Sequence, residues 1–191
     1  MNYKELFKTA LALISSPAKA WNEISRQTDR RKVYTAFVYP MIGLCALSVF
    51  IGSLLSKGWS GPQSFQVAMT HCCAVAVALF GGYFLAAYGI NRAGVRLFGQ
   101  RDDLLQVHRL AGYALVVPFL LQIVTGLLPD FTIMAFLLQF YIVYVIWEGV
   151  PVMTKVPDSL RLQYTLVCTV LLTVCPWLIR YVFFKLTVLL N

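Results

Sequence analysis

The chain has 191 residues, of which 59% are apolar and only 13% are charged. Soluble domains contain roughly 45–50% apolar and about 25% charged residues, so this composition excludes an ordinary soluble domain. Helices satisfy their own backbone hydrogen bonds and can therefore cross lipid. We predict an all-α, polytopic membrane helix bundle without a separate soluble domain.

Residues 1–32 are expected to form a cytoplasmic interfacial segment. Apolar side chains recur there at helical spacing, and Lys4, Glu5 and Lys8 lie on the other side. This pattern predicts an amphipathic helix on the membrane surface. The apolar positions are Tyr3, Leu6, Phe7, Ala10, Leu11 and Ile14.

A second short helix is predicted to begin at Ser16-Pro17, because serine is a preferred N-cap and proline is favoured at the first helical position. Trp21 lies on this helix and is expected at the level of the lipid headgroups, where tryptophan is enriched. Ala18-Lys19-Ala20 is similar to a signal-peptidase site, but the apolar stretch before it is too short for a signal peptide. We therefore expect this segment to be retained.

Residues 33–191 are expected to form one membrane domain of five transmembrane helices, since about 20 apolar residues cross a bilayer. The sequence between residues 128 and 130 is a tight Leu-Pro-Asp turn, so the third and fourth spans should form an antiparallel hairpin. The expected spans are residues 33–55, 67–90, 110–128, 131–149 and 164–190.

The fifth span contains two basic residues, Arg180 and Lys185. A charge near the bilayer centre is costly. We expect Arg180 to extend to the headgroups opposite the entry point of the helix, beside Trp177 in the aromatic belt.

Lysine and arginine are unevenly distributed between the segments that flank the spans. Thirteen lie in the N-terminal segment or in the second and fourth loops, and only Lys57 lies in the first and third loops. The positive-inside rule therefore places the N-terminus and loops two and four in the cytoplasm and the C-terminus outside.

The basic N-terminal residues, part of a net charge of +8, are expected to contact anionic lipid headgroups or another membrane or cytoplasmic protein. Their position directly before the first span favours these partners over nucleic acid. These contact residues, with Trp21 beside them, are Lys4, Lys8, Lys19, Arg30, Arg31 and Lys32.

Small residues recur at every fourth position of the second span. This spacing lets another helix approach closely and predicts a helix-packing face. The residues are Thr70, Ala74, Ala78, Gly82 and Ala86.

The hairpin of spans three and four offers two polar pairings. Reflection through the turn places Gln122 near the depth of Gln139, and Arg109 near that of Glu148. His108 is a second candidate partner for the Glu148 carboxylate. These pairs either stabilise the hairpin by joining its two helices or line a polar cavity. We favour the stabilising role.

Metal binding and catalysis are not indicated. His71, Cys72 and Cys73 are consecutive, and consecutive helical residues point about 100° apart, so they cannot converge on one ion. The apolar runs contain no H-E-x-x-H or G-x-S-x-G motif. We expect no metal, no cofactor and no enzymatic activity.

Three short motifs occur in a characteristic order. The first, Ser-Pro-Ala-Lys-Ala-Trp-Asn-Glu-Ile at residues 16–24, includes Pro17 and Trp21. The second is Gly112-Tyr113 followed by Pro118, and the third contains Tyr141, Tyr144, Gly149 and Pro157. Together they resemble the Yip family of five-span membrane proteins, whose eukaryotic members are named for their association with Rab GTPases.

The sequence departs from the eukaryotic members, because it has neither their long acidic and polar N-terminal domain nor their Asp-Leu-Tyr-Gly-Pro motif. The resemblance therefore implies a bacterial-type protein of the inner membrane, with no assigned activity. Two functions remain open: a non-enzymatic scaffold or adaptor that uses the basic N-terminal segment, and a small-solute transporter or channel subunit that uses the polar residues of spans three and four.

Overall fold

The computed structural model describes residues 3–29, 31–57 and 61–190, and within these ranges the regular structure is entirely helical. The prediction of an all-α polytopic bundle is confirmed. In chain order the elements are α1 (Tyr3–Ser15), α2 (Pro17–Ser25), the π-helix η1 (Tyr34–Val38), α3 (Tyr39–Lys57), α4 (Pro62–Phe98), α5 (Leu104–Ala114), α6 (Val116–Leu127), η2 (Pro129–Phe131), α7 (Thr132–Leu138), α8 (Tyr141–Met153), η3 (Asp158–Leu160) and α9 (Arg161–Leu190).

Three helical stretches among the described residues are long and apolar enough to cross a membrane: Tyr34–Ser56, Pro62–Phe98 and Asp158–Thr187. Two further candidates are bent pairs of helices. The break between α5 and α6 is 40°, and the break between the η2–α7 segment and α8 is 43°. The number of spans is therefore three, or up to five if each bent pair is one span.

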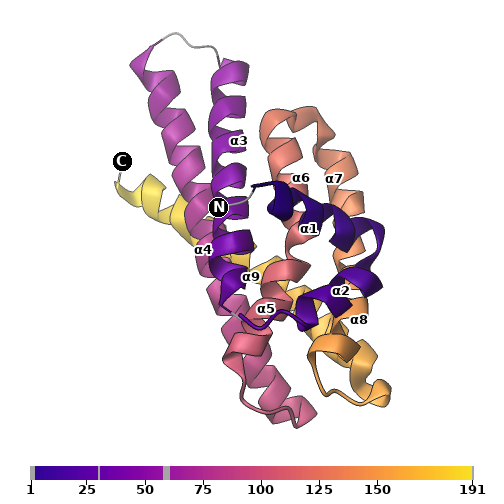
Figure 1. Ribbon diagram of the computed structural model, residues 1–191. Helices are drawn as coiled ribbons and strands as arrows, with labels where there is room; N and C mark the ends of the chain where they lie inside the picture. The colour runs from indigo at the N-terminus through magenta and orange to yellow at the C-terminus, as the bar shows by residue number, and fades with distance from the viewer. Residues whose placement is uncertain (1–2, 30, 58–60, 191) are drawn as a thin grey trace.

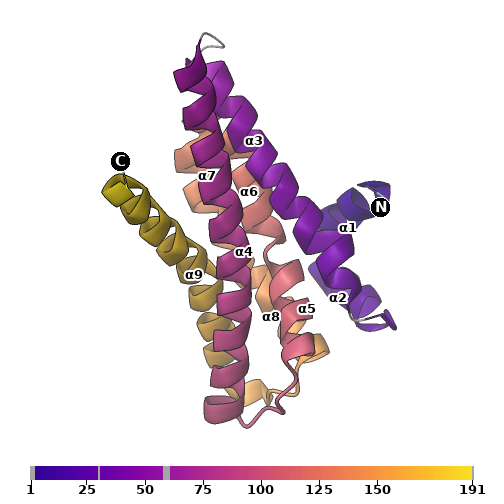
Figure 2. The same ribbon diagram turned by 90° about the vertical axis from the view of Figure 1, so that its left-hand side faces the viewer.

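The long helices α3 and α4 form an antiparallel pair, α9 packs along α4, and α6 and α7 form a second hairpin beside them (Figure 1). The short α1–α2 hairpin projects from the flank of this bundle, and the C-terminal part of α9 diverges from α4 (Figure 2).

Helix α4 is longer than the 67–90 span expected from the sequence. It begins with Pro62 in its first turn and ends at Gly99, whose φ of 62° is the left-handed conformation that glycine adopts readily. Arg92 and Arg96, which we expected in a loop, therefore lie on the helix. We ended the predicted span where the charged residues begin. Charged residues do not end a helix, and α4 continues until Gly99.

Prolines explain two irregularities of the backbone. Proline lacks an N–H and its ring clashes with the carbonyl of the residue four positions earlier. For Pro118 that residue is Ala114, where α5 ends, and for Pro40 it is Ala36, which lies within the π-helix η1. Pro118 thus accounts for the 40° break between α5 and α6, and Pro40 accounts for the π-helix at the start of α3.

Candidate functional site

Trp21 of α2 is fully buried in the bundle, so the prediction that it lies at the lipid headgroups is wrong. Its indole Nε1 donates a hydrogen bond of 2.9 Å to the carbonyl oxygen of Val145 in α8. Its ring makes an edge contact with Tyr113 of α5, at a centroid distance of 6.3 Å. The protein supplies both the apolar surroundings and the polar partner that an interface would otherwise provide for tryptophan.

Arg109 of α5 is also buried, and its guanidinium reaches the C-terminal end of α2. Nη2 donates to the carbonyl oxygen of Ile24 and, at 3.4 Å, to that of Gln27. The last carbonyls of a helix lack partners within the helix and carry partial negative charge, so a cation there is favourable. Arg109 therefore fixes the end of α2 against α5.

Gly149 and Tyr141 complete this contact, which we call the hairpin junction, and Gly112 lies next to it. A Cβ at Gly149 would lie 2.6 Å from Cε2 of Trp21, and a Cβ at Gly112 would lie 2.8 Å from a methyl of Val33. The hydroxyl of Tyr141 donates a 2.7 Å hydrogen bond to the carbonyl oxygen of Ile14 at the end of α1. The junction consists of Trp21, Arg109, Tyr113, Tyr141 and Gly149, whereas Gly112 packs against Val33 and Val38, which follow the hairpin.

The other motif positions lie outside the junction. Pro118 begins the bent part of the α5–α6 segment, and Tyr144 is exposed beside Tyr141. Pro157 has an extended backbone and precedes η3. Pro17 occupies the first turn of α2, after Ser16, whose side chain makes no capping hydrogen bond.

A family model, the Yip1 domain, matches residues 11–179. The chain belongs to the Yip1 domain family. The suspected relationship to the Yip family is therefore confirmed, and the matched range contains the complete hairpin junction. Comparisons with curated proteins and with solved structures gave no match.

The N-terminal helix of this Yip1 domain protein divides its apolar face between two environments. Leu6, Ala10 and Leu13 are buried against the bundle, whereas Tyr3, Phe7 and Leu11 are exposed. The predicted interfacial face is thus only partly available, because the protein covers one side of α1. Of the predicted basic contact residues, Lys4, Lys8, Lys19, Arg31 and Lys32 are exposed, and Arg30 lies outside the described residues.

The small residues of α4 lie along its contact with α9. A Cβ at Gly82 would lie 2.5 Å from the Cα of Pro176, so the two backbones touch at this point. Ala78 and Ala86, one turn to either side, are buried, and Ala74 is half-buried beside a cavity that the end of α9 also lines. The packing partner of this face is therefore a helix of the same chain.

Arg109 donates to the end of α2, and its predicted pairing with Glu148 stays a prediction. His108 does not serve Glu148. Its Nδ1 lies 2.7 Å from the carbonyl oxygen of Leu104, and its ring packs against Tyr83 at 5.4 Å. Reflection through the turn compares only spans three and four. It therefore could not predict that α2 folds back onto Arg109.

Gln122 and Gln139 do share a location. Both amide side chains line one cavity of about 310 Å³ between α4, α6, α7 and α9. No hydrogen bond joins the two amides in the described structure, so the cavity separates them. The hairpin brings the two glutamines to the same cavity, as reflection through the turn predicts. They do not stabilise the hairpin through a hydrogen bond to each other in the described structure.

Proposed function

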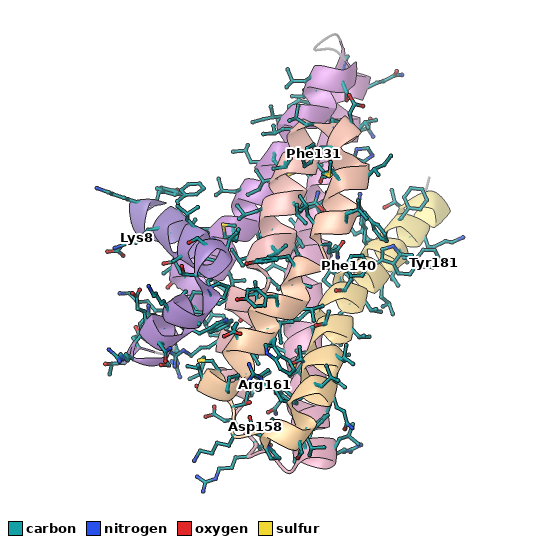
Figure 3. All side chains as sticks on the ribbon, turned by 90° about the vertical axis from the view of Figure 1, so that its right-hand side faces the viewer. Lys8, Phe131, Phe140, Asp158, Arg161 and Tyr181 are labelled. Atoms are coloured by element: carbon teal, nitrogen blue, oxygen red, sulfur yellow. The ribbon has the colours of Figure 1, made fainter. Side chains whose placement is uncertain are left out.

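We propose that this Yip1 domain protein is a non-enzymatic membrane scaffold or adaptor, and that α1 is its lipid-contacting surface. The observation that carries the proposal is the hairpin junction. It holds the α1–α2 hairpin to the bundle while Tyr3, Phe7 and Leu11 remain exposed beside Lys4 and Lys8. Figure 3 shows Lys8 at the edge of the hairpin that is farthest from the bundle.

Anionic lipid is the partner that fits both features of this surface. Exposed apolar side chains on a surface helix enter the boundary between headgroups and acyl chains, and each nearby lysine adds about 1 kcal/mol of attraction to an anionic membrane. The hairpin junction already holds the α1–α2 hairpin in place, so α1 does not have to fold when it binds lipid. The adaptor role would follow from the same fixed position, since a partner at the membrane meets a preformed surface.

The test uses the full chain in phosphatidylglycerol vesicles, with a fluorophore on a cysteine at position 7 and the native cysteines replaced. We expect the fluorophore to be quenched by lipids that carry spin labels near the headgroup. Lys4→Glu together with Lys8→Glu should reduce this quenching several-fold, because the reversed charges repel the anionic surface. The matched control reverses the same number of charges at Arg96 and Lys155, and equal loss in both variants would contradict the proposal.

We also propose the cytoplasmic placement of the hairpin. The second and fourth loops lie at one end of the bundle, where the Lys155 N–H bonds to Oε1 of Gln100 at 3.1 Å. Phe131 and Asp158 lie toward opposite ends (Figure 3). With a membrane-impermeant thiol reagent, cysteines at positions 96 and 155 should react only from the cytoplasmic side, and a cysteine at position 130 only from the other side. Reaction of all three from one side would contradict this orientation.

A second candidate function is that of a small-solute transporter or channel subunit, favoured by the cavity that Gln122 and Gln139 line. The two functions predict different effects of replacing the two glutamines. Gln122→Leu with Gln139→Leu should leave membrane contact by α1 unchanged, whereas a transporter would lose solute flux. Flux through reconstituted wild-type protein that the double variant abolishes would favour transport.

A further inference from the structure

The exposed residue Arg180 lies nearer the middle of the bundle along its length than its sequence position suggests. On α9, Pro176 packs against Gly82 and Ile179 packs against Gly81 of α4. Arg180 lines one cavity with Val75 and Ala78. At 1.5 Å per residue, Ala78 is about 20 Å from Arg92 and about 24 Å from Pro62, near the middle of the apolar part of α4.

Two observations indicate that the Arg180 backbone lies away from the end of the bundle, although we expected its side chain to extend to the headgroups there. The helix α9 begins beside the cytoplasmic end of α8, where the Arg161 guanidinium donates a 2.7 Å hydrogen bond to the carbonyl oxygen of Trp147. It is tilted against the other helices (Figures 1 and 2). The stretch from Arg161 to Arg180 thus reaches only mid-depth, where an ionised side chain needs a partner.

The cavity beside Arg180 is rich in polar groups. It has a volume of about 310 Å³, and its lining includes Gln122, Thr125, Gln139, Thr173 and Arg180. Phe140 and Tyr181, the sequence neighbours of Gln139 and Arg180, lie at a similar height along the bundle (Figure 3). A second cavity of about 420 Å³ lies against the same guanidinium.

Acidic partners for Arg180 are absent from the surrounding helices. The sequences of α3, α4, α6, α7 and α9 contain no aspartate or glutamate. Within the part of the chain that the structure describes, the side chains of Gln122, Gln139 and Arg180 make no hydrogen bond or ion pair. Polar groups in apolar surroundings are costly unless they are paired, so these three side chains call for a partner from outside the chain.

We propose that this cavity binds an oxyanion, a phosphate or carboxylate group, between Arg180 and the two glutamines. Guanidinium binds such groups through two parallel N–H···O bonds, and each glutamine amide adds N–H donors. The oxyanion belongs either to a lipid headgroup or to a small free anion. The inference does not depend on the adaptor function, because the cavity contains no residue of α1 or α2.

The test uses full-length protein in dodecylmaltoside, freed of co-purified lipid. Phosphatidylglycerol is titrated by native mass spectrometry, and inorganic phosphate by calorimetry at constant ionic strength. We expect at least one probe to bind wild type about tenfold or more tightly than it binds Arg180→Gln. Lys185→Gln is the matched control, since it removes the same charge from α9 and Lys185 lines neither cavity.

Each outcome has a defined meaning. Loss of phosphatidylglycerol binding alone identifies a lipid headgroup, and loss of inorganic phosphate binding identifies a free anion. Equal binding by wild type and Arg180→Gln overturns the proposal and leaves a cavity filled only with water. If Arg180→Gln does not fold, Arg180→Lys and the double variant Gln122→Leu, Gln139→Leu replace it, and wild-type affinity in both also overturns the proposal.

Discussion

Replacing Gly52 with alanine is expected to destabilise the bundle more than any other single-methyl change considered above. Gly52 of α3 is buried against Gly126 of α6, and an added Cβ would overlap the Gly126 carbonyl oxygen. A backbone atom cannot move aside as a flexible side chain can, so α3 and α6 must separate. Overpacking typically costs about 1–3 kcal/mol, and this rigid contact should cost at least about 2 kcal/mol.

The matched control is Gly43→Ala, on the same helix. Nothing lies within 4 Å of a Cβ at Gly43, so the added methyl meets no neighbour. Alanine is favoured over glycine in a helix by about 0.5–1 kcal/mol, and this variant should match or exceed the wild-type apparent melting temperature in detergent. A similar loss in both variants would mean that α3 and α6 do not meet at Gly52.

Trp21→Ala is expected to release the α1–α2 hairpin from the bundle. The substitution removes a fully buried side chain and the hydrogen bond to Val145, and truncation of a buried tryptophan typically costs about 3–5 kcal/mol. Trypsin should then cleave at Lys19 and Arg26 much faster than in wild type. The melting of the remaining bundle should change less, because α3, α4, α6 and α9 pack together without the hairpin.

Trp177→Ala is the control for this release, because Trp177 is 69% exposed and lies on α9. It should leave tryptic cleavage of the hairpin unchanged. Tyr141→Phe provides a graded comparison, since it removes one hydrogen bond worth about 1 kcal/mol, whereas Tyr144→Phe removes an exposed hydroxyl. Rapid cleavage in wild type would contradict a hairpin held at the junction.

The sequence was a sufficient basis for predicting the fold class and the approximate limits of the helices. Apolar length locates α3, α4 and α9, and the Pro17 signal locates the start of α2. The break between α7 and α8 at Gln139 and Phe140 was not predictable, because neither proline nor glycine marks it. Helix breaks of that kind depend on packing that a one-dimensional pattern does not contain.

The sequence motifs identified most residues of the candidate site but not the contacts between them. The motifs contained Trp21, Tyr141 and Gly149, yet their convergence depends on the α1–α2 hairpin folding back onto α8. Interfacial preference alone therefore gave the wrong environment for Trp21. The height of Arg180 along the bundle was not predictable for a related reason, since residue counting along α9 contains no information about its tilt or its crossing with α4.

The hydrogen bond from Trp21 to Val145 joins residues that are 124 positions apart. At a synthesis rate of about 5–20 residues per second, the ribosome needs roughly 6–25 seconds after Trp21 to make its acceptor. During that interval Trp21 lacks the acceptor of its indole N–H and the surface of α8 that helps to bury it. The hairpin can therefore reach its final position against the bundle only after α8 has been translated.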